Sequence, residues 1–302
     1  MSEVTVLVPS YNHAPFVERT LRSIFAQTLA PKKLIVIDDG SKDESVSVIE
    51  RVLAESPFET RFISRENRGL CATLNEGFVH VDTDFFAYIS SDDTWLPQFI
   101  ENRARLLTSR PDAVLAYGYS YLIDPSDEIT DSTRNWAEYA DGDALEMLLF
   151  PIIPASASVL YRSSFLSECR WNESSKLEDY ELYVRLAARG DFALDPGSPL
   201  SAWRIHGNNT SNDFALMMNE WIDAQRRTMS ETGLTEERLA EVQSRLKFRC
   251  VKDFIRRGDR ETAWKLFAEN RGAAPLIESI STALRFLVPA AVWARRNGSD
   301  LK

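Results

Sequence analysis

The chain has 302 residues, enough for one large domain or for one domain with an appendage. Its hydrophobic content of 44% and charged content of 26% are typical of a soluble globular protein, and its net charge of −10 argues against a general nucleic-acid binder. The three cysteines, Cys71, Cys169 and Cys250, are too far apart in sequence to predict a metal cluster or a disulfide framework. Because the chain also begins without a secretion signal, we expect a cytoplasmic protein.

The first half of the chain alternates between predicted strands and predicted helices. Short apolar runs predict strands at residues 4–8, 34–37, 61–63 and 85–89. Apolar residues at helical spacing predict helices at residues 15–25, 41–53 and 70–81, the second opened by a capping box at residues 41–44. This order implies a parallel sheet with right-handed crossovers and helices on both faces.

The second half has a different pattern. Strands are predicted at residues 113–117, 119–123, 157–161 and 199–205, helices at residues 143–150 and 177–189, and a loop at residues 124–139. From about residue 212 the pattern predicts helices only. We therefore predict an α/β fold with a mostly parallel central sheet flanked by helices, followed by an all-helical C-terminal region. The expected domains are residues 1–211, with halves at about 1–110 and 111–211, and residues 212–302.

Two adjacent aspartates at the end of a hydrophobic run are the most informative feature. Asp92 and Asp93 follow the buried strand predicted at residues 85–89, after two serines. Ligands of open α/β sheets bind just beyond the carboxyl ends of the strands. Two neighbouring carboxylates there disfavour each other's ionisation, and a divalent cation such as Mn²⁺ or Mg²⁺ would offset that cost. The simpler alternative is a solvated acidic turn before a helix that starts near Trp95.

Polar clusters follow three of the predicted strands, at residues 9–12, 38–41 and 90–93. Each cluster alone fits a turn with local side-chain hydrogen bonds. Three clusters at the same edge of one sheet are harder to explain as separate turns, and they predict a shared site.

The order and spacing of these motifs resemble the nucleotide-sugar half of family 2 glycosyltransferases with the GT-A fold. The motifs are Pro-Ser-Tyr-Asn at 9–12, Ile-Asp-Asp-Gly-Ser at 37–41, Glu-Asn-Arg-Gly-Leu at 66–70, Asn-Glu-Gly at 75–77 and Ser-Ser-Asp-Asp at 90–93. Leu-Glu-Asp-Tyr-Glu-Leu at 177–182 is similar to the family's Glu-Asp motif, and residues 204–211 resemble its Arg-x-His segment. The resemblance covers about residues 3–211 and implies a Rossmann-like GT-A fold.

The resemblance implies a site for a nucleotide-sugar donor. It assigns Asp39 to the base, Asp92 to the ribose or the donor sugar, and Asp93 to a metal ion on the diphosphate. The other residues expected to bind the donor are Pro9, Ser10, Tyr11, Asn12, Asn67, Gly69 and Asn75. The family often has an acidic residue two positions before Asp92, where this chain has Ser90, so the site carries less negative charge.

The resemblance also implies the residues that act on the acceptor. Asp179 matches the family's general base, and its neighbour Glu178 is expected to orient the acceptor hydroxyl. His206 is expected to be a metal ligand or to donate to the diphosphate, and Arg204 is expected to do the latter. The simpler alternative for the acidic pair is favourable charge at a helix N-terminus, and a lone histidine is more often structural.

Together these features predict an inverting, metal-dependent glycosyltransferase. The resemblance implies a UDP-linked donor and a glycan or lipid-linked glycan acceptor in cell-surface polysaccharide synthesis. Two alternatives stay open, a non-catalytic module that binds sugar nucleotides and a sugar nucleotidyltransferase, although the glycine-rich phosphate loop of the second is missing.

The end of the chain combines an apolar run at residues 286–294 with basic flanks. The run is too short to span a bilayer. Peripheral contact with the inner face of the membrane, packing on the body of the protein and self-association all fit this pattern.

Overall fold

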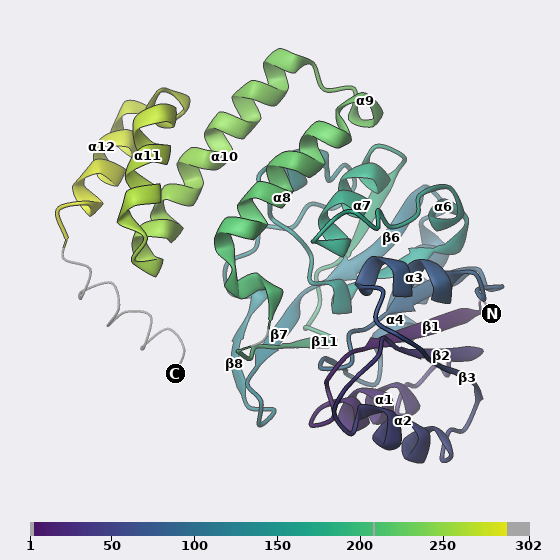
Figure 1. Cartoon of the computed structure of the whole chain (residues 1–302). Helices are drawn as coiled ribbons and strands as arrows, with labels where there is room; N and C mark the ends of the chain where they lie inside the picture. The colour runs from purple at the N-terminus through teal and green to yellow at the C-terminus, as the bar shows by residue number, and fades with distance from the viewer. Residues whose placement is uncertain (1–2, 208, 289–302) are drawn as a thin grey trace. The chain divides into compact units, whose positions relative to one another are not determined.

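The computed structural model describes residues 3–207 and 209–288 (Figure 1). They fall into two compact units, Met1–Leu148 with Ile152–Gly207, and Leu149–Pro151 with Asn208–Lys302. The division expected at residues 211 and 212 remains a prediction. The expected membrane segment at residues 286–294 lies outside the described residues from position 289 onward, and the Arg-x-His segment includes Asn208, which also lies outside them.

The first unit holds two sheets. The 7-stranded sheet has the order β10-β6-β9-β4-β1-β2-β3 and the 4-stranded sheet the order β5-β11-β7-β8. The strands are β1 (Val4–Ser10), β2 (Lys33–Asp38), β3 (Glu59–Ser64), β4 (Phe85–Tyr88), β5 (Thr94–Trp95), β6 (Ala113–Gly118), β7 (Ser120–Ile123), β8 (Ile129–Ser132), β9 (Leu160–Arg162), β10 (Asp191–Asp195) and β11 (Ser201–Arg204). The large sheet is parallel except at β9, which runs antiparallel between β4 and β6.

Helices cover both faces of the large sheet in the first unit. They are α1 (Val17–Phe25), α2 (Ser45–Leu53), α3 (Leu70–Phe78), α4 (Phe99–Ser109), α5 (Leu145–Leu149), α6 (Ser163–Glu168) and α7 (Glu178–Ala187). The alternation along β1 shows why two layers form. Val6 and Val8 point into the core shared with α1, α2 and α4, whereas Leu7 points to the other face, against Gly77 of α3. The predicted α/β fold with a mostly parallel sheet is confirmed.

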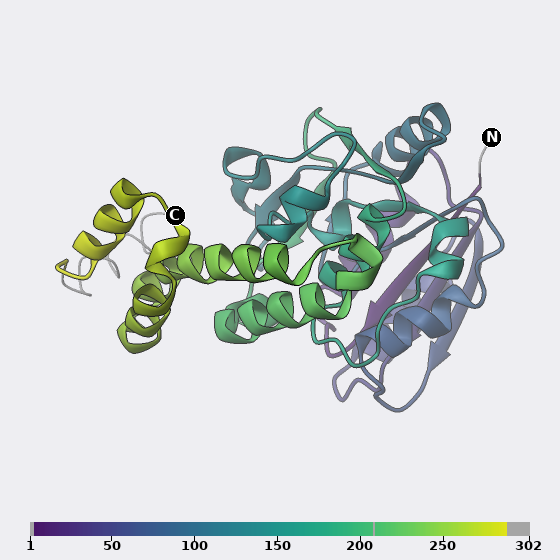
Figure 2. The same cartoon turned by 90° about the horizontal axis from the view of Figure 1, so that it is seen from above.

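The second unit is helical in its described part. Its helices are α8 (Phe214–Arg227), α9 (Met229–Thr232), α10 (Glu236–Arg257), α11 (Arg260–Asn270) and α12 (Leu276–Arg285). Figures 1 and 2 show α8 and α10 side by side, and α10 also packs on α11. Within the described part of the chain, every helix is too short or too polar to cross a membrane.

Several local predictions were wrong. The expected loop at residues 124–139 contains β8, which pairs with β7. Residues 191–195 form the edge strand β10, which is not predicted because its apolar run is short and has an aspartate at each end. The helix expected near Trp95 starts at Phe99, because residues 94–95 pair with β11.

The capping box predicted at the start of α2 is also absent. The Ser41 hydroxyl donates to the carboxylate of Asp38 and accepts from the N–H of Asn12 instead. In a capping box this hydroxyl would accept from a backbone N–H of the helix. Here its two hydrogen bonds connect the loop that follows β1 to the loop that follows β2.

Candidate functional site

The carboxyl ends of β1, β2 and β4 lie next to one another in the large sheet. Ser10 pairs with Asp38 in the register of β1 and β2, and the N–H of Asp39 donates to the carbonyl of Ser10 at 2.8 Å. On the other side of β1, the N–H of Ile89 donates to the carbonyl of Leu7 at 3.0 Å. The three polar clusters expected at this edge are therefore neighbours in space.

The loop after β1 is held by Asn12. Its φ of 55° lies in the left-handed region, which asparagine tolerates better than most residues. Its side-chain oxygen accepts from the N–H of Lys42 at 2.7 Å. Tyr11 stays 45% exposed beside it, and the buried Ser10 hydroxyl has no hydrogen-bond partner among the described residues. This loop thus presents an exposed ring and an unsatisfied hydroxyl at the sheet edge where Pro9 also lies.

The carboxylate of Asp39 organises the loop that follows β3. It accepts from the N–H of Arg68 at 2.8 Å and of Gly69 at 2.9 Å, and it pairs with the guanidinium of Arg65. Asn67, in the middle of this loop, is exposed. The structure therefore brings Asp39, Asn67 and Gly69 together, as expected, and shows that Asp39 shapes the loop that would surround a bound base.

Gly40 lets this loop approach the end of β2 closely. Its φ is +81°, and a Cβ at this position would lie 2.7 Å from the backbone nitrogen of Asn67. We expect Gly40→Ala to lower the free energy of unfolding by about 1–3 kcal/mol, because both the backbone conformation and the space exclude a side chain. Urea denaturation would measure the loss. Gly272→Ala is the matched control, since a Cβ there meets open space and its φ is not positive. Equal stability of the two variants would contradict the steric argument.

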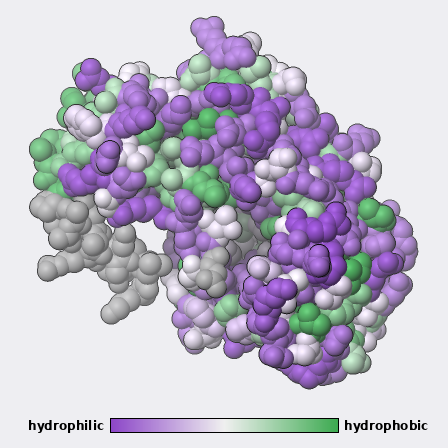
Figure 3. Space-filling model, in the orientation of Figure 1, coloured by the Kyte–Doolittle hydropathy of each residue, from purple (hydrophilic) through white to green (hydrophobic). Residues whose placement is uncertain are grey.

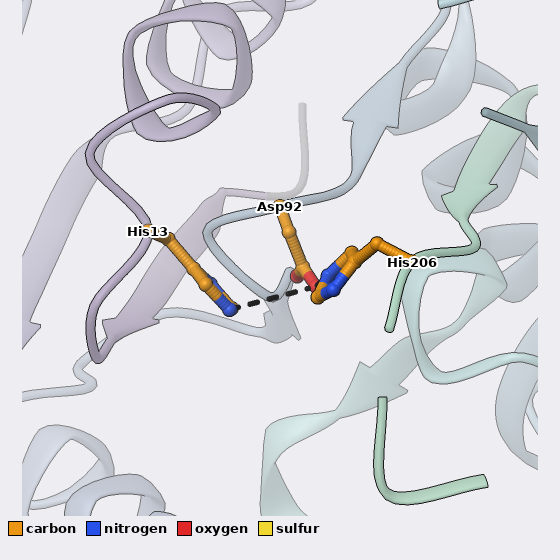
Figure 4. Close-up of side chains that lie close together, drawn as sticks. All are labelled: His13, Asp92 and His206. Carbon is orange, nitrogen blue, oxygen red and sulfur yellow. Dashed lines mark hydrogen bonds and ion pairs between the residues drawn. The ribbon is translucent and has the colours of Figure 1, made fainter. Parts of the chain in front are cut away.

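Three side chains converge beyond β4 and β1 (Figure 4). Nε2 of His206 lies 2.9 Å from Oδ2 of Asp92, and Nε2 of His13 lies 3.8 Å from the same oxygen. One ligand atom from each residue falls within 4.8 Å of the others. The remaining oxygen of Asp92, Oδ1, is buried and has no hydrogen-bond partner among the described residues. Two imidazoles and a carboxylate with an unsatisfied oxygen are a donor set that fits a divalent cation.

Neighbouring groups hold the two histidines in place. The ring of His206 stacks on the ring of Phe16, with centroids 5.3 Å apart. Nδ1 of His13 lies 2.8 Å from the hydroxyl oxygen of Ser91. Burial lowers the pKa of His13 below its usual value, against the opposing pull of Asp92. A neutral imidazole is the form that binds a metal ion.

Asp93 does not belong to this group of three side chains among the described residues. Its carboxylate accepts from the backbone N–H of Arg204 at 2.8 Å, and its side chain is buried. Burial, and then the negative charge of Asp92, raise its pKa above the usual value. The role of direct metal ligand expected for Asp93 remains a prediction, and Asp92 is the aspartate that lies next to both imidazoles.

Arg204 makes several contacts within the protein. Its guanidinium is fully buried, lies over the ring of Phe16 and donates to the carbonyl oxygens of Asp92 at 2.7 Å and Asp124 at 2.8 Å. It further pairs with Asp127 at 2.6 Å. These contacts position the Asp92 turn, and the diphosphate contact expected for Arg204 remains a prediction.

Asn75 lies outside the cluster as well. Its amide donates to the carbonyl of Trp171 at 2.9 Å and accepts from the N–H of the same residue at 3.1 Å. A second amide hydrogen goes to Glu173 at 3.1 Å. These bonds link α3 to the segment before α7, and the donor contact expected for Asn75 remains a prediction.

Glu178 and Asp179 open α7, where carboxylates interact favourably with the helix dipole. Both residues are partly buried. Burial and the charge of Asp179 raise the pKa of Glu178 to about 8, and burial raises the pKa of Asp179 to about 6. The charge of Asp92 also contributes to the raised pKa of Glu178.

The buried phenol of Tyr88 is a polar neighbour of Glu178. Its Oη lies 3.4 Å from Oε1 of Glu178, and its ring stacks on that of Tyr161. The sequence predicts Tyr88 only as part of a buried strand and gives no site role to His13. The signal for His13 was its place directly after the Pro-Ser-Tyr-Asn motif, at the same sheet edge as Asp92.

The raised pKa of Glu178 has a consequence for stability. The folded protein binds its proton more tightly than the unfolded chain, so stability is full below the ordinary value of 4.5 and falls as pH rises toward about 8. We expect Glu178→Gln to raise the free energy of unfolding on the order of 1–3 kcal/mol at about pH 8.5 and to change it little at about pH 4.5. Denaturant unfolding at both pH values would measure this, and an equal effect at the two values would contradict the assignment.

Comparisons with known proteins agree with this architecture. The family model described as glycosyl transferase family 2 matches residues 5–166. An uncharacterised glycosyltransferase of Rickettsia conorii is 26% identical over 196 residues, which cover 61% of this chain and 31% of the relative. A second one, of Nostoc sp., is 24% identical over 170 residues, covering 55% of this chain and 52% of the relative. The chain thus spans about a third to a half of the length of these two relatives.

Solved structures of glycosyltransferases share the fold. TarS of S. aureus, in complex with UDP-GlcNAc, superposes with a TM-score of 0.66 at 13% identity, covering 90% of this chain and 82% of that one. The mannosyltransferase PcManGT of Pyrobaculum calidifontis, in complex with GDP-Man and Mn²⁺, has a TM-score of 0.64 at 17% identity and covers 97% and 83%. These likenesses show the GT-A fold. Because the family model covers more than half of the sequence, the chain belongs to glycosyl transferase family 2.

Proposed function

We propose that the chain is an inverting glycosyltransferase that moves a sugar from a nucleoside diphosphate sugar to a hydroxyl group. The observation that carries the proposal is the proximity of two acidic centres in one unit. Asp92 lies with two histidines at the carboxyl edge of the sheet, and its charge acts on Glu178 at the start of α7. One centre suits an anionic donor with a cation, and the other suits proton transfer from an acceptor.

The donor would bind at the edge formed by β1, β2 and β4. The loop 9–12 and the loop shaped by Asp39 would surround the nucleoside, with Asp39 as the acceptor for a base N–H. His13, Asp92 and His206 would hold the cation, since Oδ1 of Asp92 is buried with no hydrogen-bond partner in the described chain. When bound, the cation supplies positive charge that stabilises the diphosphate leaving group. Because Mg²⁺ prefers oxygen ligands, the two imidazoles favour Mn²⁺.

Asp179 would act as the general base. Its carboxylate takes the proton of the acceptor hydroxyl while that oxygen forms a bond to the anomeric carbon. The bond from this carbon to the diphosphate oxygen breaks at the same time, and the leaving group keeps the electron pair. Attack from the face opposite the leaving group inverts the anomeric configuration. Glu178, neutral at pH 7 because burial raises its pKa to about 8, can donate a hydrogen bond that orients the acceptor.

The substrates are proposed at a finer level from the family resemblance. We take UDP as the first nucleotide to test, although the two solved relatives bind UDP-GlcNAc and GDP-Man respectively. A glycan or lipid-linked glycan would be the acceptor, in synthesis of a cell-surface polysaccharide at the cytoplasmic side of the membrane. The Escherichia coli relative named chondroitin synthase is 27% identical over 218 residues, which cover 69% of this chain and 30% of the relative, and it supports a glycan acceptor.

The test is a donor screen on the purified chain. UDP-, dTDP- and GDP-sugars are offered with Mn²⁺, Mg²⁺ or EDTA, and release of nucleoside diphosphate is followed. The proposal expects slow hydrolysis of one donor in the presence of a cation, with the opposite anomer as the first product by NMR. Release of pyrophosphate from a nucleoside triphosphate and a sugar phosphate would instead indicate a nucleotidyltransferase. Retention of the anomeric configuration would contradict the inverting mechanism.

A further inference from the structure

One face of α12, in the second unit, is made of exposed aliphatic side chains. Leu276 is 75% exposed, Ile277 83%, Ile280 52% and Leu284 55%; we call these four residues the α12 apolar face. At 100° per residue they fall within an arc of about 100° of the helix. Figure 3 shows a hydrophobic area in this part of the chain, over α11 and α12. Leu287, 78% exposed, and Trp264 of α11, 57% exposed, add to it.

The opposite side of α12 is anchored in the second unit. Thr282 is fully buried, and Glu278 pairs with Lys252 of α10 at 3.4 Å. The ring of Phe286, just after the helix, packs edge-on against Trp264 at 5.3 Å. Arg260 donates to the carbonyl oxygen of Val288 at 3.0 Å. The helix is therefore held in a defined orientation, and its apolar face is the side turned away from its own unit.

The charge of the chain is segregated along its sequence. Residues 271–302 contain five Lys and Arg against two Asp and Glu, a net charge of +3. The whole chain carries −10, so the first 270 residues carry −13. The one acidic residue of α12, Glu278, is already paired with Lys252 and lies near Arg245 at 3.8 Å. An anionic surface would thus attract this end of the chain and repel the rest.

We propose that the α12 apolar face docks on an anionic lipid bilayer. A helix that lies in a membrane interface has this combination of an aliphatic face, nearby Trp and Arg side chains, and low overall hydrophobicity. A second copy of the chain is a poorer occupant, because pairing through this face would bring two segments of charge +3 together. The sequence that follows, with Val292, Trp293, Arg295 and Arg296, continues the same composition. This inference does not depend on the proposed function.

Co-sedimentation with vesicles tests the proposal on the full chain. One vesicle type contains phosphatidylcholine with phosphatidylglycerol, and the other contains phosphatidylcholine alone. We expect binding to the anionic vesicles that weakens at high salt, and little binding to the neutral ones. The double change Ile277→Glu and Ile280→Glu should lower the partition at least about a hundredfold, since burial of each isoleucine contributes roughly tenfold or more.

The control is Val79→Glu, which adds a charge to an apolar residue that is 70% exposed in the first unit. It should bind vesicles as the unchanged chain does, and circular dichroism should show that all variants are folded. Absence of vesicle binding by the unchanged chain, or equal binding by the double variant, would overturn the proposal. So would sedimentation velocity showing an oligomer, without lipid, that the double change dissociates, because the face would then be a subunit interface.

Discussion

Replacing Asp179 with Asn is expected to lower the transfer rate by about 10²–10⁴-fold, the range by which a positioned general base accelerates a reaction. The amide keeps the shape of the side chain and removes its ability to take a proton. Donor affinity should change little, because Asp179 lies at the start of α7 and not among the donor loops. Initial rates at saturating donor and acceptor, with donor titrations on the same samples, would separate the two effects.

A matched control for this change is Asp82→Asn. Asp82 precedes β4 at the amino edge of the sheet, and its side chain is 58% exposed. This variant should transfer sugar at the unchanged rate. A full rate for Asp179→Asn, or an equal loss in both variants, would remove Asp179 from the role of base.

The same role predicts a pH profile. Because burial raises the pKa of Asp179 to about 6, the base is ionised above that value and protonated below it. Transfer should therefore fall as pH drops through about 6, well above the range of an ordinary aspartate. The profile of Asp179→Asn should lack this limb, and a profile that keeps it would assign the titration to another group.

Replacing Asp92 with Asn is expected to weaken binding of Mn²⁺ at least about tenfold. Even partners outside the direct ligand shell change metal affinity by about 10–100-fold, and Asp92 supplies the only carboxylate of the cluster found in the described chain. Calorimetric titration with Mn²⁺ alone measures this without any substrate. His13→Ala should also weaken binding of Mn²⁺. That loss would show that His13 acts as a ligand and does not only hydrogen-bond to Ser91.

Asp93→Asn is the contrasting variant in the same turn. Its carboxylate accepts from the N–H of Arg204 and is not part of the His13, Asp92 and His206 group found in the described residues, so its loss should lower stability more than ion affinity. If Asp93→Asn abolishes Mn²⁺ binding while Asp92→Asn leaves it intact, the assignment of the two aspartates is reversed.

Much of the fold could be predicted from the sequence, because the strongest signals for its strands and helices are local. Short apolar runs such as residues 34–37 and 85–89, bounded by polar turn residues, favour buried strands, and the helices predicted between them favour the parallel order. The antiparallel position of β9 and the edge strand β10 depend on pairing with β6 from distant parts of the chain. Such pairing leaves no local pattern, so these features could not be predicted.

The site shows the same limit at the level of side chains. Clustering of Asp92 with His206 follows from the two motifs, but which of two adjacent aspartates faces the histidine depends on where β11 runs. The sequence shows the charge of Arg204, which suggests a phosphate ligand. It does not show that the side chain is fully buried. The sequence does not predict a site role for His13, because a single histidine in a loop belongs to no periodic pattern. Only the fold brings its ring close to Asp92.

The central claim is that the cluster of His13, Asp92 and His206 binds a cation together with a nucleoside diphosphate sugar. The measurement that tests it most directly is calorimetric titration of UDP-, dTDP- and GDP-sugars into the purified chain, with Mn²⁺ or with EDTA, for the unchanged protein and for Asp92→Asn. The account predicts binding of one donor that requires the cation and is lost in Asp92→Asn. Donor binding of equal strength in EDTA, or unchanged binding in Asp92→Asn, would contradict it.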